Sequence, residues 1–192
     1  LARVLCTLMP DEPEPLGLLA LMRLHDSRRD ARVDADGRLV LLEDQDRTRW
    51  DRAAIAEGGA LVERALALGG DGPYVLQAFI AVEHVRDGGP DWLGVAGAYD
   101  RLLAIQGGPV IALNRAVAVA MAHGPERGLA LVDELEPELD GYHLFHSTRA
   151  DLLRRLDRRA EAAVAYERAL AVAENPVERE FLERRLVEVK RP

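Results

Sequence analysis

The sequence predicts an all-α protein built from consecutive helical hairpins, and three observations support this. Apolar residues recur with a helical period along nearly the whole chain. Glycine and proline divide it into segments of helix length. Aromatic residues make up only 5% of the 192 residues and β-branched residues rarely cluster, so strands are poorly supported.

The helices follow from these boundaries. They are expected at about residues 1–9, 14–31, 51–68, 73–86, 91–105, 109–123, 125–137, 141–157, 159–173 and 176–189. Residues 33–51 are the exception, because Asp36 and Gly37 give a turn signal, a short apolar run follows, and residues 44–47 are densely polar. We expect this segment to form one short loop or hairpin insertion.

Composition limits the classes of partner. The net charge is −8, which argues against direct binding of nucleic acid. The single cysteine, Cys6, excludes an internal disulfide and a zinc site with several cysteine ligands, which fits a cytoplasmic protein. No apolar run approaches the length of a membrane span, so no membrane association is expected. Because the chain starts at Leu1, we expect it to be a piece of a longer protein.

An internal repeat is present in the second half. Residues 99–105 (YDRLLAI), followed by Pro109, align with residues 166–172 (YERALAV), followed by Pro176. The offset is 67 residues, close to two units of 34. A repeat of this length is typical of stacked helical hairpins.

Small residues recur at the same interval. Ala116 and Gly128 stand 34 residues before Ala150 and Ala162, where the two helices of a hairpin approach each other. This period resembles the tetratricopeptide (TPR) repeat. Residues 73–192 are therefore expected to form about three TPR-like hairpins of a right-handed superhelix. Residues 1–72 form an N-terminal helical segment in this interpretation, with the polar loop at 33–51, and the whole is expected to be one continuous domain.

The last repeat and the final helix give the sharpest packing predictions. Tyr166 is expected to fill the gap between successive hairpins. Asn175 is expected to cap the final helix, with Pro176 at its first position and Glu178 reaching back. An apolar face then seals the end of the stack, formed by Val177, Phe181, Leu182, Leu186 and Val189.

The helix at 109–123 is expected to line the concave groove of the repeats with apolar side chains. A groove of this kind does not stay exposed to water, so we expect residues 1–69 or another protein to cover it. The predicted groove residues are Val110, Leu113, Val117, Ala120 and Met121.

Several ordered motifs carry a family resemblance. Residues 5–22 (LCTLMPDEPEPLGLLALM), 24–29 (LHDSRR) and 41–51 (LLEDQDRTRWD) resemble the C-terminal extension of a group of bacterial extracytoplasmic-function (ECF) sigma factors. The similarity continues through residues 140–146 (DGYHLFH) and 149–156 (RADLLRRL), so it covers essentially the whole chain.

The resemblance implies a transcription initiation factor whose promoter-binding and polymerase-binding domains lie outside this chain. The extension is then a non-enzymatic regulatory domain that contacts the sigma domains of the same protein, core RNA polymerase, or both. An alternative is a free-standing TPR-like adaptor that binds a peptide or partner protein. Both interpretations are compatible with a homo-oligomer.

Metal sites are poorly supported. Asp34, Asp36 and Glu43 match positions of a calcium-binding EF-hand loop, but Arg32 would occupy its first ligand position. A turn explains the same residues. His143 and His146 lie three apart on a helix, yet no third ligand follows at suitable spacing, and helix packing is the better interpretation.

Catalysis is equally poorly supported. An acid–base cluster around His25 and Asp46 would define an enzyme, but no nucleophile motif or glycine-rich phosphate loop accompanies it. We therefore expect no catalytic residue, cofactor or metal.

The polar segment at 44–50 is the candidate site, either as a partner-contact loop or as a structural one. In the structural account, Asp46 or Thr48 caps the following helix, acidic and arginine side chains pair with residues at 25–29, and the indole of Trp50 is buried. In the functional account, the loop docks the sigma domains or polymerase. The candidate residues are His25, Arg28, Asp44, Gln45, Asp46, Arg47 and Trp50.

Overall fold

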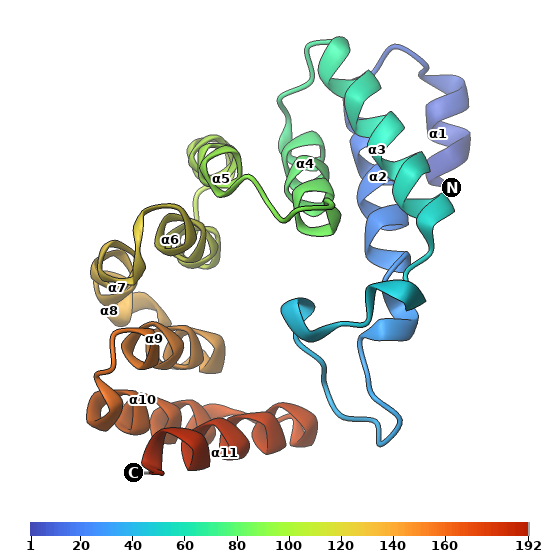
Figure 1. The fold of residues 1–192 in the computed structure, drawn as a ribbon. Coiled ribbons are helices and arrows are strands. Elements are labelled where there is room, and N and C mark those ends of the chain that lie inside the picture. Colours follow the sequence, from blue (N-terminus) through green and yellow to red (C-terminus); the bar gives the residue numbers. More distant parts are fainter. Residues whose placement is uncertain (192) are drawn as a thin grey trace. The chain divides into compact units, whose positions relative to one another are not determined.

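The protein is all-α, as predicted. The computed structural model describes residues 1–191 (Figure 1). Within that range we find no strand, only an isolated antiparallel bridge between Val33 and Leu39. The chain forms two compact units, residues 1–106 and 107–192. Residues 73–106 therefore group with the N-terminal segment, and the predicted boundary between residues 72 and 73 lies inside the first unit.

The first unit contains α1 to α5 and the loop insertion. Its helix α2 packs against both α3 and α4, while α4 also packs against α5. The loop between α2 and α3 contains three short 3-10 turns, η1 (Arg29–Ala31), η2 (Leu42–Asp44) and η3 (Arg47–Arg49). The helices are α1 (Ala2–Leu8), α2 (Pro13–Asp26), α3 (Arg52–Ala67), α4 (Pro73–Val85) and α5 (Trp92–Gln106).

Helix α2 ends earlier than the predicted residue 31. Buried Ser27 turns its hydroxyl back to the Leu24 carbonyl oxygen at 2.7 Å. The Ser27 carbonyl accepts instead from the Asp51 N–H, at 2.9 Å, which ties the end of α2 to the start of α3. A serine hydroxyl that bonds to the preceding turn competes with continuation of the helix.

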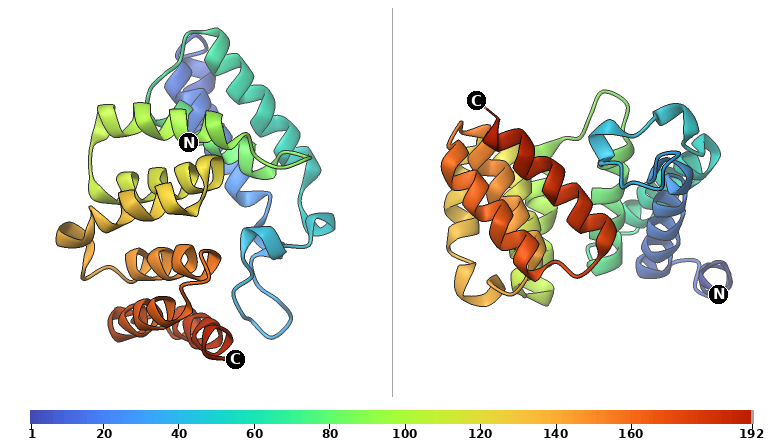
Figure 2. Two further views of the ribbon diagram at one scale, coloured as in Figure 1. Left: turned by 60° about the vertical axis from the view of Figure 1, so that its left-hand side comes forward. Right: turned by 90° about the horizontal axis from the view of Figure 1, so that it is seen from below.

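The second unit is a series of helices in which neighbours in sequence are neighbours in space. Helix α6 packs on α7, α7 on α9, α9 on α10 and α10 on α11, and Figure 2 shows the last three side by side. The helices are α6 (Pro109–His123), α7 (Pro125–Asp133), α8 (Glu136–Leu139), α9 (His143–Arg155), α10 (Arg159–Val172) and α11 (Pro176–Lys190).

The segment predicted as one helix at 125–137 is broken into α7 and α8. Pro137 explains the break, because it has no N–H to donate to the carbonyl of Asp133 and its ring would collide with that carbonyl. Asp133 is the last residue of α7.

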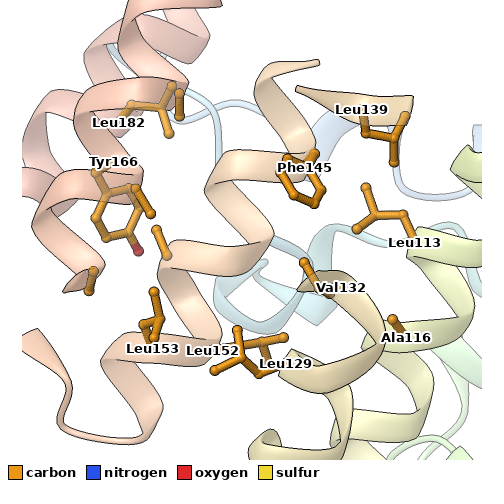
Figure 3. Close-up of a cluster of buried hydrophobic side chains, with 14 of the residues drawn as sticks. Leu113, Ala116, Leu129, Val132, Leu139, Phe145, Leu152, Leu153, Tyr166 and Leu182 are labelled. Carbon is orange, nitrogen blue, oxygen red and sulfur yellow. The ribbon is translucent and has the colours of Figure 1, made fainter. Parts of the chain in front are cut away.

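The core of the second unit confirms the packing predicted for the last repeat. Tyr166 is 2% exposed, and Ala150, Ala162 and Ala169 are fully buried around it. Figure 3 shows Tyr166 in the same apolar cluster as Phe145. The gap between α9, α10 and α11 is thus filled by one aromatic ring.

The close approach predicted at Gly128 is also confirmed. A Cβ atom built on Gly128 would lie 2.3 Å from the Cβ of Ala120 and 2.9 Å from the carbonyl oxygen of Ala116. No side chain fits at this crossing of α6 and α7.

The five residues predicted to line a groove on α6 differ in burial, and Val117 is half-buried. Leu113 and Ala120 are buried, and both belong to the core of the second unit. Val110 and Met121 are exposed. The expectation that residues 1–69 or a partner cover the groove stays a prediction.

The cap predicted for the start of α11 is confirmed. The Asn175 side-chain oxygen accepts from the Val177 N–H at 2.9 Å, and Pro176 follows at the first helical position. Glu178 does not reach back to the cap as predicted. Its carboxylate lies 3.1 Å from Nε2 of His143 on α9 instead.

Candidate functional site

Four segments of the first unit meet around Trp50: the end of α2, the polar loop, the start of α3 and the end of α4. Trp50 is 3% exposed, as the structural account predicted. The indole belongs to a buried apolar cluster. Leu24 and Ala31, which precede Trp50 in the sequence, and Ala81 and Val85 of α4 are the other buried members. This burial anchors the polar loop at its C-terminal end.

Asp46 holds the turn that precedes Trp50. Its Oδ1 accepts from the backbone N–H of Thr48 at 2.9 Å and from the Thr48 hydroxyl at 2.7 Å. Both hydrogen bonds lower the pKa of Asp46 below its usual value, and the bond from the Thr48 hydroxyl has the larger effect. The prediction that Asp46 or Thr48 caps the next helix is wrong. Asp46 caps only the turn η3, and Asp51 caps α3 by accepting from the Ala54 N–H at 2.9 Å.

Arg47 ties the loop to the end of α4. Its Nη1 donates to the carbonyl oxygen of Arg86 at 3.1 Å, and its guanidinium carbon lies 4.8 Å from the centre of the Trp50 ring. A guanidinium over an indole face is a favourable cation–π contact. Asp87 adds an ion pair with Arg52, at 3.3 Å between Oδ1 and Nη1.

Gln45 is buried within the same loop. Its Nε2 donates to the Val40 carbonyl at 3.3 Å, while its Oε1 has no hydrogen-bond partner among the described residues. The buried Nε atom of Arg28 and the indole Nε1 of Trp50 also lack partners within residues 1–191. Buried polar atoms without partners are uncommon and call for a water or a ligand.

Among the described residues, no acidic side chain of the loop pairs with the end of α2, which corrects the second half of the structural account. Arg29 pairs with Asp26, its neighbour one turn earlier. The Asp46 carboxylate is occupied by Thr48, and Asp44 is exposed. At His25, the backbone carbonyl accepts from Nη2 of Arg32 at 2.7 Å.

His84 of α4 completes the region, and sequence reasoning missed it. Its ring lies 5.7 Å from the ring of Trp92 at the start of α5. Burial is the main cause that lowers the pKa of His84, and the charges of Arg28 and His25 lower it further. The pKa of His25 is lowered by burial and then by Arg28 and Arg32. The sequence pattern does not predict that His84 lies near Arg28, because their proximity depends on the packing of α4 on α2.

The other candidate sites have ordinary structural partners. Asp34 Oδ1 accepts from the backbone N–H groups of Asp36 and Arg38, each at 2.9 Å, which is the turn expected from the sequence. His146 Nε2 lies 2.6 Å from the Asp140 carbonyl oxygen. His143 faces Glu178 of α11 instead, so the two imidazoles have different partners.

The comparisons with known proteins match a family model to the part of the chain that contains the polar loop. Residues 1–66, which contain α1, α2 and the polar loop, match a family of unknown function (DUF6596). The chain is also 44% identical over 189 residues to the uncharacterized protein R00370 of Rhizobium meliloti (strain 1021). That alignment covers 97% of this chain and 45% of the relative, so the chain spans less than half of the relative's length. Neither name states an activity.

No solved structure matches the chain. Among residues 1–191, we find no helix that is both long and apolar enough to cross a bilayer.

Proposed function

We propose that this chain is a regulatory, non-enzymatic region of a cytoplasmic ECF-type sigma factor that acts through protein contacts. The family resemblance supports this, because its motifs occur in order from residue 5 to residue 156. One of them, at residues 41–51, is the polar loop. The relative from Rhizobium meliloti also supports it, since a protein more than twice as long has room for further domains.

The observation that carries the proposal is the way the polar loop is held. Trp50 buries one end, Asp46 closes the turn, and Arg47 bonds to the end of α4. Thr48 and Arg49 remain exposed between these anchors. A loop of fixed shape loses little conformational freedom on binding, which favours its use as a docking surface.

The charge of the chain favours a protein partner over promoter DNA. A net charge of −8 does not favour the sequence-independent attraction of a DNA backbone. The partners in this proposal are the sigma domains of the same protein, core RNA polymerase, or both.

The experiment is promoter-dependent transcription with core polymerase. The gene upstream of Leu1 is read first, and the full-length product is compared with a version that lacks residues 1–192. Sigma domains upstream, together with altered transcription after the deletion, support the proposal. A start codon next to Leu1 and no effect on polymerase would overturn it and favour the adaptor.

A further inference from the structure

Arg28 differs from Arg23 and Arg29 because the buried Nε of its guanidinium has no hydrogen-bond partner among the described residues. Arg23 bonds to Glu57 at 2.7 Å, and Arg29 pairs with Asp26. For Arg28, no side-chain hydrogen bond or ion pair is present within residues 1–191, although its Nε is buried. A guanidinium cannot shed its charge at neutral pH, so a buried N–H of this group requires an acceptor.

Three further basic side chains gather near Arg28. Arg32 lies at the backbone carbonyl of His25, and the side chains of His25 and His84 both lie close enough to Arg28 for its charge to lower their pKa. Burial lowers the pKa of Arg28 itself, and Arg32 adds to this. We call these four residues, His25, Arg28, Arg32 and His84, the basic cluster.

Within residues 1–191, one acidic side chain acts on the basic cluster, and it is already engaged elsewhere. The charged groups that act on Arg28 and His25 are all basic. Glu83 is the acidic group that acts on His84. Its carboxylate is already occupied, because it accepts from the Asp91 N–H at 2.8 Å and from Arg86 Nη1 at 3.1 Å. Two guanidinium groups whose charges act on each other, one of them with a buried Nε, are unfavourable together unless an anion joins them.

We propose that the basic cluster is a binding site for a phosphate-type dianion. Arg28 and Arg32 carry two permanent positive charges, which match the two negative charges of a phosphate ester. The buried Arg28 Nε supplies a donor that is already desolvated, and each imidazole offers one N–H when neutral and two when protonated. This inference does not rest on the proposed function, since it concerns a ligand of the first unit alone.

The first test is binding of inorganic phosphate to the whole chain by calorimetry, with matched variants. Arg28→Gln should weaken phosphate binding about tenfold or more, because it removes charge-assisted hydrogen bonds. Arg29→Gln removes the same charge one residue away, from an exposed ion pair, and should change the affinity less than about twofold. Absence of saturable binding would overturn the proposal, as would equal weakening by both variants.

A second readout keeps the test decisive if Arg28→Gln does not fold. Proton NMR of the imidazoles in the wild-type chain should show the pKa of His25 and His84 rising as phosphate is added, because an anion stabilises their charged forms. Arg32→Gln should reduce that rise. Titration curves that do not move with phosphate would overturn the proposal.

Repeating the binding measurement with sulfate shows whether the pH dependence comes from the site or from the ligand. Sulfate stays a dianion over the pH range in which histidine titrates, whereas phosphate changes its charge there. The sulfate affinity should increase as the pH falls through the pKa values of His25 and His84. An unchanged sulfate affinity across this range would contradict a role for these histidines.

A phosphorylated metabolite and a phosphorylated side chain carry the same group. Comparing a phosphoserine peptide with inorganic phosphate distinguishes them. Tighter binding of the peptide assigns the site to a phosphoprotein, and equal or weaker binding assigns it to a small molecule.

Discussion

Gly17 of α2 lies directly against the backbone of Val75 of α4. A Cβ atom built on Gly17 would stand 2.6 Å from the Val75 nitrogen, so no side chain fits there. One turn earlier, the Glu14 carboxylate accepts from the N–H groups of Tyr74 and Val75, each at 3.2 Å. Helix α2 thus provides both the space for α4 and the cap for its N-terminus, since the N-cap residue Gly72 has no side chain to do so.

Gly17→Ala should destabilise the first unit by about 1 to 3 kcal/mol, because the added methyl group meets backbone atoms that cannot move aside. Gly59→Ala is the matched control. Gly59 also lies in a helix, but its Cβ would have nothing within 4 Å. The control should stabilise by roughly 0.5 to 1 kcal/mol through helix propensity. Urea denaturation followed by circular dichroism measures both, and shifts in the same direction would contradict the packing.

Tyr166→Ala should destabilise the second unit by about 3 to 5 kcal/mol, because it leaves a cavity among α9, α10 and α11. Tyr166→Phe keeps the ring and should cost only about 1 kcal/mol. The same denaturation measurement applies. A change of less than about 0.5 kcal/mol for Tyr166→Ala would contradict the repeat alignment that placed this residue between hairpins.

Asn175→Ala should cost about 0.5 to 2 kcal/mol, because it removes the side-chain acceptor for the Val177 N–H at the start of α11. Asn114→Ala makes the same substitution at an exposed interior position of α6. There alanine should be neutral or slightly stabilising, since its helix propensity is higher. Equal thermal shifts for the two variants would show that the cap contributes nothing.

The first unit should lose stability as the pH falls below about 6.5, the ordinary pKa of histidine. Because the folded state lowers the pKa of His25 and His84, the unfolded chain binds protons first, and protonation favours unfolding. The loss begins near the unfolded pKa and is complete once the pH is below the lowered folded pKa. The double variant His25→Gln with His84→Gln should show a shallower dependence of the free energy of unfolding on pH. Parallel curves for variant and wild type would refute this origin.

The sequence was sufficient wherever the determining contacts are local. Asn175 and Pro176 define the start of α11 because the cap acts over two residues. Tyr166 and Gly128 could be placed because a 34-residue repeat predicts which positions of neighbouring helices meet. Pro137 disfavours a continuous helix and indicated a break after α7, but the prediction of one helix at 125–137 did not take this into account.

The candidate site was predicted only in part, because two of its features depend on tertiary packing. Asp46 and Asp51 are equally good caps by residue type, and only the burial of Trp50 between them decides that α3 starts after Asp51. His84 approaches Arg28 because α4 packs on α2, which local patterns do not specify.

Asp46→Ala combined with Arg47→Ala should impair regulation more than folding, if the polar loop docks a partner. The double variant removes the two hydrogen bonds from Thr48 to Asp46 and the exposed bond from Arg47 to the Arg86 carbonyl. Trp50 still anchors the loop through its apolar contacts. The matched control is Arg158→Ala with Glu161→Ala, an exposed ion pair on α10. Transcription with the full-length protein should change for the loop variant and not for the control. If regulation and the free energy of unfolding fall together, the loop is a structural element and docking must be sought elsewhere.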